Sequence, residues 1–170
     1  MFKYFDPFTE QWLHNRAKDQ LLSPALDWHF PGNGGLDGDI SKSCFMRLAY
    51  DAERSYVNWD GLNSLVYVLD CWIENNSSWF KFNGLNRCIA NFYAPGQVIG
   101  WHTDHSKNNY YTLIYYVNDA DGGTEVGDQQ ILHKENAGII LKSNVSHNPI
   151  VSKVPRRISV AWILDGEIRD

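Results

Sequence analysis

Short β-rich segments separated by turn residues fill the chain from Arg87 onward, and this pattern limits the folds available to it. The segments are rich in β-branched and aromatic residues, and glycine, proline and asparagine lie between them. The predicted strands are 87–93, 98–104, 110–118, 129–133, 138–142, 145–151 and 156–164. Many short strands after a helical first half are typical of an α+β protein with a jelly-roll core.

Two helices are predicted before these strands. Leu13, Ala17 and Leu21 recur on one face of the segment 7–22. A broader apolar stripe follows in the segment 61–75, formed by Leu62, Leu65, Val66, Leu69, Trp72 and Ile73. A turn is predicted at Phe82-Asn83-Gly84. We expect the N-terminal helices to pack against one sheet.

Length, charge and cysteine content narrow the classes of protein. A chain of 170 residues suits a single domain, with residues 1–85 as helical support and loops and 86–165 as the core. The net charge of −5 argues against nucleic acid as a partner. Three widely spaced cysteines favour free thiols in the reducing cytoplasm. The sequence has no apolar signal region and no run long enough to span a membrane, so no membrane partner is expected.

His102 and Asp104 form an H-x-D pair at the end of the predicted strand 98–104. Side chains at positions i and i+2 of a strand point to the same face, so this imidazole and carboxylate can reach one point. His147 follows in a later predicted strand. Two histidines and one carboxylate make the facial triad that binds Fe(II) in non-heme oxygenases. The remaining histidines have no assignable partner and are expected to be surface or structural residues: His14, His29, His105 and His133.

The motifs around these residues occur in one characteristic order. They are Tyr93-Ala94-Pro95-Gly96, His102-Thr103-Asp104, Ile114-Tyr115-Tyr116-Val117-Asn118, Gly122-Gly123, Gly138-Ile139-Ile140-Leu141, His147, Arg156 and Trp162. In order and spacing they resemble the Fe(II)- and 2-oxoglutarate-dependent oxygenase superfamily, especially its prolyl 4-hydroxylase-like branch. The resemblance covers Asn91 to Trp162.

This resemblance implies a fold, a cofactor set and a reaction. The fold would be a double-stranded β-helix, with His102, Asp104 and His147 as iron ligands. The cofactors would be Fe(II), 2-oxoglutarate as co-substrate and O₂, with ascorbate as a possible addition. The enzyme would hydroxylate a C–H bond of a prolyl, peptidyl or free amino-acid substrate and release succinate and CO₂.

The resemblance also implies a cation inside the barrel for the C5 carboxylate of 2-oxoglutarate. A planar guanidinium can bind a carboxylate bidentately, and both Arg156 and Arg157 are candidates. Alternation places Arg156 on the face of Ile158, Val160 and Trp162, and Arg157 on the other face. In the family the basic residue lies six positions before the tryptophan, which selects Arg156.

Further side chains are assigned to the pocket by the same resemblance. Tyr116 and Thr112 stand where the family places hydroxyl partners of the C5 carboxylate, and Tyr93 stands where it places a phenol near the co-substrate. For Thr112 and Tyr93, simple packing is an equally open interpretation. Trp101 and Trp162 are candidates for the pocket lining, with ordinary core positions as the alternative.

Two other functions compete with hydroxylation. The pair Asn91 and Tyr93 before H-x-D also occurs in AlkB-like nucleic-acid demethylases, in which Asn91 would hydrogen-bond 2-oxoglutarate. That family ends with two arginines six positions apart, whereas Trp162 stands six positions after Arg156 here. The other alternative is a non-catalytic jelly-roll binding module, which would need no internal cation facing an iron site.

Loops are expected to carry the specificity for a peptide, protein or small-molecule substrate. The candidates are the loop from Asp51 to Asp60 and the glycine-rich loop from Gly32 to Gly38. In the first loop, Arg54, Tyr56 and Trp59 are the candidate substrate contacts.

Overall fold

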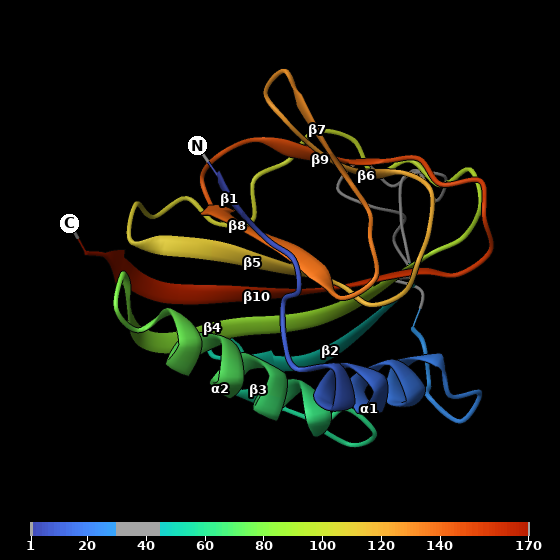
Figure 1. Ribbon diagram of the computed structural model, residues 1–170, viewed down its shortest axis with the longest axis horizontal. Helices are drawn as coiled ribbons and strands as arrows, with labels where there is room; N and C mark the ends of the chain where they lie inside the picture. The colour runs from blue at the N-terminus through green and yellow to red at the C-terminus, as the bar shows by residue number, and fades with distance from the viewer. Residues whose placement is uncertain (1, 30–44, 170) are drawn as a thin grey trace.

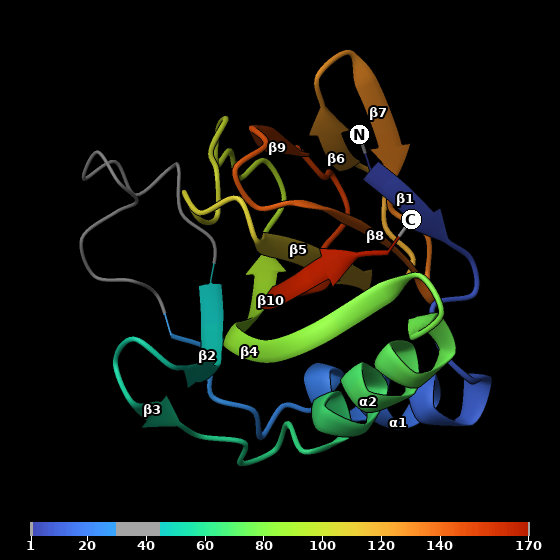
Figure 2. The same cartoon turned by 90° about the vertical axis from the view of Figure 1, so that its left-hand side faces the viewer.

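The computed structural model describes residues 2–29 and 45–169, which form two antiparallel sheets and two helices (Figures 1 and 2). The strands are β1 (Phe2–Phe5), β2 (Phe45–Asp51), β3 (Tyr56–Val57), β4 (Phe80–Tyr93), β5 (Tyr110–Tyr116), β6 (Gly123–Val126), β7 (Gln129–Leu132), β8 (Ala137–Lys142), β9 (His147–Ile150) and β10 (Arg157–Ile168). The helices are α1 (Gln11–Leu22) and α2 (Ser64–Asn76). The predicted loop from Gly32 to Gly38 lies outside the described residues.

The two sheets face each other. Seven strands form the larger sheet in the order β1-β8-β5-β10-β4-β2-β3, and three strands form the smaller sheet in the order β7-β6-β9. An isolated bridge between His102 and His147 adds one more chain segment beside β9. Figure 1 shows the larger sheet between the smaller sheet above it and the two helices below it. The predicted double-stranded β-helix, with N-terminal helices against one sheet, is therefore confirmed.

Alternation along β5 separates two apolar cores. Leu113 and Tyr115 belong to the core between the larger sheet and the helices. Ile114 and Tyr116 belong to the core between the two sheets. Because successive side chains of a strand point to opposite faces, β5 contributes to both cores at once. The space between the sheets is called the barrel interior below.

The direction in which the side chains of β10 point contradicts one prediction. Ile158, Val160 and Trp162 belong to the helix-side core, so this face of β10 is turned away from the barrel interior. Trp162 has 0% exposure, and its ring lies nearly parallel to that of Phe8, at 8° and 6.1 Å between centroids. Trp162 is therefore a core residue, and the prediction that it lines the pocket is wrong.

Both helices begin later than their apolar patterns indicate. The predicted stripe of α1 is buried as expected, with Leu13, Ala17 and Leu21 inside, but the helix begins at Gln11. Gly61 has φ of 72°, outside the helical region, so α2 begins only at Ser64.

Two local predictions are wrong. Residues 98–104 form no regular strand, because Gly100 has φ of 85° and only His102 makes a bridge. The predicted turn at 82–84 lies inside β4, which continues through it. Register shifts between β4 and β10 on either side of Gly84 absorb the irregularity.

The first half of the chain contributes sheet as well as helices, since β1 and β2 are both strands of the larger sheet.

In the part of the chain that the structure describes, no helix has the length and apolar content needed to cross a bilayer. The thiols of Cys71 and Cys88 are free.

Candidate metal centre

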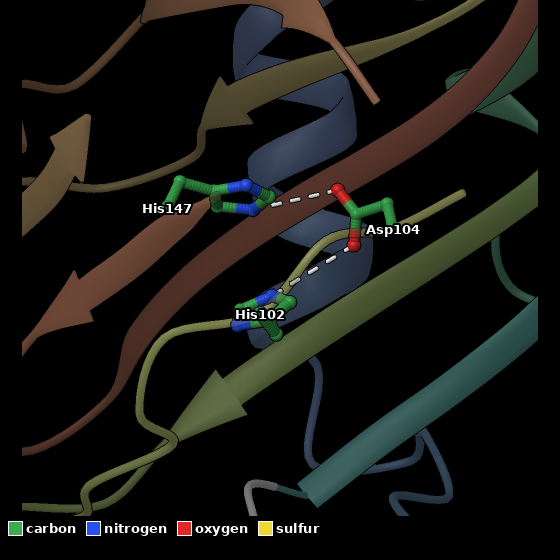
Figure 3. Close-up of side chains that lie close together, drawn as sticks. All are labelled: His102, Asp104 and His147. Carbon is green, nitrogen blue, oxygen red and sulfur yellow. Dashed lines mark ion pairs between the residues drawn. The ribbon is translucent and has the colours of Figure 1, made fainter. Parts of the chain in front are cut away.

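His102, Asp104 and His147 form one cluster, called the triad below (Figure 3). Nε2 of His102 lies 3.7 Å from Oδ1 of Asp104, and Nε2 of His147 lies 3.4 Å from Oδ2 of the same carboxylate. One ligand atom from each residue lies within 4.8 Å of the others. The structure thus brings together the three side chains that the sequence predicted as ligands.

Main-chain pairing holds the two histidines beside each other. The amide of His102 donates to the carbonyl of His147 at 2.9 Å, and the amide of His147 donates back at 2.9 Å. The ring centroids are 4.5 Å apart. This bridge joins two segments that are distant in the sequence, so pairing between segments places His102, rather than a continuous strand through residues 98–104.

Hydrogen bonds to carbonyls select the imidazole nitrogens that face the carboxylate. Nδ1 of His102 lies 2.9 Å from the carbonyl of Gly100, and Nδ1 of His147 lies 3.2 Å from that of Val145. Carbonyls only accept, so Nδ1 donates in both rings and the lone pair of each neutral ring lies on Nε2. Burial lowers the pKa of His147, which favours the uncharged form that binds metals.

Thr112 and Ser143 hold the carboxylate of Asp104. The hydroxyl of Thr112 donates to Oδ2 of Asp104 at 2.7 Å and lies 2.9 Å from the hydroxyl of Ser143. The amide of Asp104 donates to the carbonyl of Ser143 at 2.9 Å. The sequence predicted that Thr112 contacts 2-oxoglutarate, but its hydroxyl instead orients the acidic residue of the triad.

The donor set of the triad fits a divalent iron ion. Two neutral imidazoles and one carboxylate are the ligands of the Fe(II) facial triad. Two ligand atoms at about 2.1 Å from a metal and at right angles lie about 3 Å apart. The separations of 3.4 and 3.7 Å between nitrogens and oxygens are close to that value. Each imidazole and the carboxylate also have the outer hydrogen bonds that fix metal ligands in place.

Arg157, and not Arg156, is the arginine in the barrel interior. Arg157 is 2% exposed, whereas Arg156 is exposed, with φ of 65°. Arg156 lines a hollow of about 290 Å³ on the helix side, together with Trp28 and Phe92. The predicted alternation is correct, but the face shared with Trp162 is the outer one, so the choice of Arg156 is wrong.

Arg157 reaches from the larger sheet to two strands of the smaller one, β6 and β9, and to the residue that follows β7. Its Nε donates to Nδ1 of His133 at 3.1 Å, just after β7. Its terminal nitrogens donate to the carbonyl of Ile150 in β9 at 2.7 Å and to that of Gly123 in β6 at 2.5 Å. The ring of Tyr93 lies 4.5 Å from the guanidinium carbon. These contacts fix the plane of the guanidinium.

Other predicted pocket residues lie near Arg157. Tyr93 and Asn91 face Arg157 and Ser159 in the pairing of β4 with β10. The hydroxyl of Tyr116 donates to Thr124 at 2.9 Å, and burial raises the pKa of this phenol to about 12.

The sequence assigned no partner to His133 and treated it as a surface or structural residue. In the structure it is buried beside Tyr116, with 4.5 Å between ring centroids, and Arg157 donates to it. No motif around His133 marks it, because its side-chain partners come from β5 and β10, which are distant in the sequence or paired to it only in the fold.

The candidate substrate residues are divided between two regions. Trp101 is 55% exposed and directly precedes a residue of the triad. Arg54 and Tyr56 are exposed, and the guanidinium of Arg54 lies 3.7 Å from Asp51. Trp59 is half-buried, because it stacks on a tyrosine of β2 and packs against the helix-side core; its contact with substrate stays a prediction.

No protein-family model and no curated protein matches the chain. Solved structures do match, and they show that the chain has the double-stranded β-helix fold of the 2-oxoglutarate- and Fe(II)-dependent oxygenases. One is the prolyl hydroxylase of Trichoplax adhaerens in complex with a hypoxia inducible factor peptide fragment. It has a TM-score of 0.69 and 15% identity, over 96% of this chain and 83% of that one.

Two bacterial structures are also similar. The prolyl-4-hydroxylase of Pseudomonas putida has a TM-score of 0.63 and 10% identity, over 99% of this chain and 93% of that one. HygX from Streptomyces hygroscopicus, with nickel and 2-oxoglutarate bound, has a TM-score of 0.66 and 10% identity, over 96% and 82% of the two chains.

Proposed function

We propose that this protein is an Fe(II)- and 2-oxoglutarate-dependent oxygenase that hydroxylates a C–H bond and releases succinate and CO₂. The observation that carries the proposal is a metal-ligand triad and a buried arginine in the same barrel interior. One face of β5 connects them: Thr112 binds the carboxylate of the triad, and Tyr116 packs on His133, which accepts a hydrogen bond from Arg157.

The charge of Arg157 supports a dicarboxylate co-substrate. Its three hydrogen-bond acceptors are uncharged, and no carboxylate among residues 2–29 and 45–169 forms an ion pair with it. An unpaired buried charge is unfavourable, so a retained one favours binding of an anion. A guanidinium has five N–H groups, and two remain for the C5 carboxylate of 2-oxoglutarate.

Different residues of the chain would have different roles in this reaction. The triad would hold Fe(II) by three positions and leave the others open. When bound, iron and 2-oxoglutarate supply the oxidative chemistry that hydroxylates the substrate. Arg157 would bind the distal end of the co-substrate, with Tyr116 and Tyr93 beside it. No acid–base residue is needed, because the protein's part is to bind and orient the iron, the co-substrate and the substrate and to exclude water.

A peptide, protein or free amino acid is the proposed substrate class. The Trichoplax adhaerens enzyme, with its bound peptide fragment, supports this choice. Trp101 offers an exposed aromatic surface beside the triad for such a substrate, and Arg54 and Tyr56 stay candidate contacts. A cytoplasmic location stays a prediction.

The alternative functions have less support. With Arg157 as the internal arginine, the residue six positions later is Ile163, so the paired arginines of the AlkB-like pattern do not occur. A binding module without turnover would not require a buried, unpaired cation together with a triad.

An anaerobic titration tests the proposal. Purified protein receives Fe(II) and then 2-oxoglutarate, and visible absorption is recorded. A weak charge-transfer band that needs both additions is expected, because it reports chelation of 2-oxoglutarate at an open iron site. Absence of iron binding would contradict the proposal and favour the binding module. Succinate release with peptide and amino-acid candidates then identifies the substrate.

A further inference from the structure

His133 lies in the barrel interior as the hydrogen-bond acceptor of Arg157. The side chain is 5% exposed, and its Nδ1 lies 3.1 Å from Nε of the arginine. Arginine can only donate, so Nδ1 must carry the lone pair and the proton of the neutral ring lies on Nε2. Burial lowers the pKa of His133 to about 3, and the charge of Arg157 acts in the same direction. The ring therefore stays uncharged at neutral pH.

The other acceptors of Arg157 are carbonyls, so the whole set is uncharged. Ile150 and Gly123 each accept one hydrogen bond through their main chain. A carboxylate in the place of His133 would form a charge-assisted pair with Arg157 and cancel its charge. An apolar side chain there would leave Nε–H without its acceptor and free the guanidinium to rotate. A neutral acceptor avoids both effects.

We propose that His133 is a positioning residue for the co-substrate: it fixes the guanidinium of Arg157 without neutralising it, so that the remaining N–H groups bind the distal carboxylate of 2-oxoglutarate. The inference rests on the proposed function. It adds a residue that no oxygenase motif in the sequence marks. The role of this residue is to accept a hydrogen bond while it carries no charge.

Three substitutions with side chains of similar size distinguish the effect of hydrogen-bond acceptance at position 133 from the effect of packing. His133→Asn keeps a neutral acceptor, because Oδ1 of asparagine is as many bonds from the main chain as Nδ1 of histidine. His133→Asp places a negative acceptor at the same position, and His133→Leu provides none. All three lose the contact of the imidazole with Tyr116, so they are compared with one another rather than with the wild type.

The measurement is the dissociation constant of 2-oxoglutarate for the anaerobic Fe(II) protein, with the Fe(II) affinity measured in parallel. We expect His133→Leu and His133→Asp each to bind 2-oxoglutarate about tenfold more weakly than His133→Asn, as for one hydrogen bond to a charged group. The Fe(II) affinity should be the same in all three. Equal 2-oxoglutarate affinities, or tighter binding by His133→Asp, would overturn the inference.

The wild type separates this inference from the proposed function. If wild-type protein binds Fe(II) but not 2-oxoglutarate, the proposed function is rejected by the wild type alone. The comparison of variants tests only the role of His133. A nitrogen NMR spectrum of the metal-free wild type gives a reading that no folding defect can affect. We expect His133 as the Nε2–H form with an unprotonated Nδ1, and a proton on Nδ1 would overturn the assignment.

Discussion

The hydroxyl of Thr112 donates a hydrogen bond of 2.7 Å to Oδ2 of Asp104, the oxygen that lies 3.4 Å from Nε2 of His147. One strand position therefore orients the only acidic residue of the triad. Thr112 has 0% exposure, so its side chain is held in a single packed position at this contact. The link joins β5 of the larger sheet to the loop that carries His102 and Asp104.

Removing this hydroxyl should weaken the metal site. We expect Thr112→Val to lower Fe(II) affinity by at least about tenfold, because loss of outer hydrogen bonds commonly weakens metal binding by about 10- to 100-fold. Isothermal titration with Fe(II) under anaerobic conditions measures the change. Thr112→Ser keeps the hydroxyl and is the control. Wild-type Fe(II) affinity in Thr112→Val, or a loss in Thr112→Ser with none in Thr112→Val, would contradict the role of the hydroxyl.

Loss of a triad histidine should remove iron binding. We expect His147→Ala to retain no iron at micromolar concentrations, since only two of the three proposed ligands would remain. Iron content after desalting measures the result. His105→Ala is the matched control, because His105 is next to Asp104 in the chain but contacts Glu53 and Tyr110 instead. Iron retention by His147→Ala at the wild-type level would reject the triad.

The two neighbouring arginines should differ sharply in their effect on 2-oxoglutarate. Arg157→Lys keeps the charge but loses the planar fork that contacts three acceptors, and we expect about 100-fold weaker binding. Arg156→Ala removes an exposed side chain and should bind within about twofold of the wild type.

The readout for these two variants is the band of the anaerobic Fe(II) complex, with thermal unfolding as a check on folding. If Arg156→Ala weakened the binding and Arg157→Lys did not, the co-substrate would lie on the helix side of β10. That result would support the spacing rule of the prolyl hydroxylase pattern against the structure.

Acid should destabilise the protein partly through His133. Its pKa is lowered to about 3 in the folded state against 6.5 for the free side chain, so the unfolded chain binds the proton first. The stability is complete above pH 6.5 and is lost as pH falls toward 3. Relative to His133→Asn, which cannot titrate, the wild type should lose about 1.4 kcal/mol of unfolding free energy per pH unit below pH 6.

Urea unfolding of both proteins between pH 7 and pH 4.5 measures this difference. Metal-free protein is used so that iron release does not contribute. His147 is present in both proteins, and the lowered pKa that burial gives it cancels in the comparison. Parallel pH curves would mean that His133 is already exposed or charged in the folded protein.

Most of the strand pattern and the triad could be predicted from local sequence. The apolar alternation of β5 correctly indicated that Thr112 and Tyr116 share a face. The continuous strand predicted for residues 98–104 was wrong because Gly100 adopts a left-handed conformation, which a hydropathy pattern does not reveal. His102 nevertheless meets His147, through main-chain pairing between distant segments.

The sequence by itself determined the donor set of the triad, the sheet-rich second half and the presence of two adjacent arginines before the last strand. Only the tertiary structure decided which arginine lies inside. Both faces of β10 are largely apolar, with Trp162 on one and Ile163 on the other, so its hydrophobic pattern fits either orientation. Packing of the Trp162 face against the helices turns Arg157 inward, where His133 and carbonyls of the smaller sheet accept its hydrogen bonds.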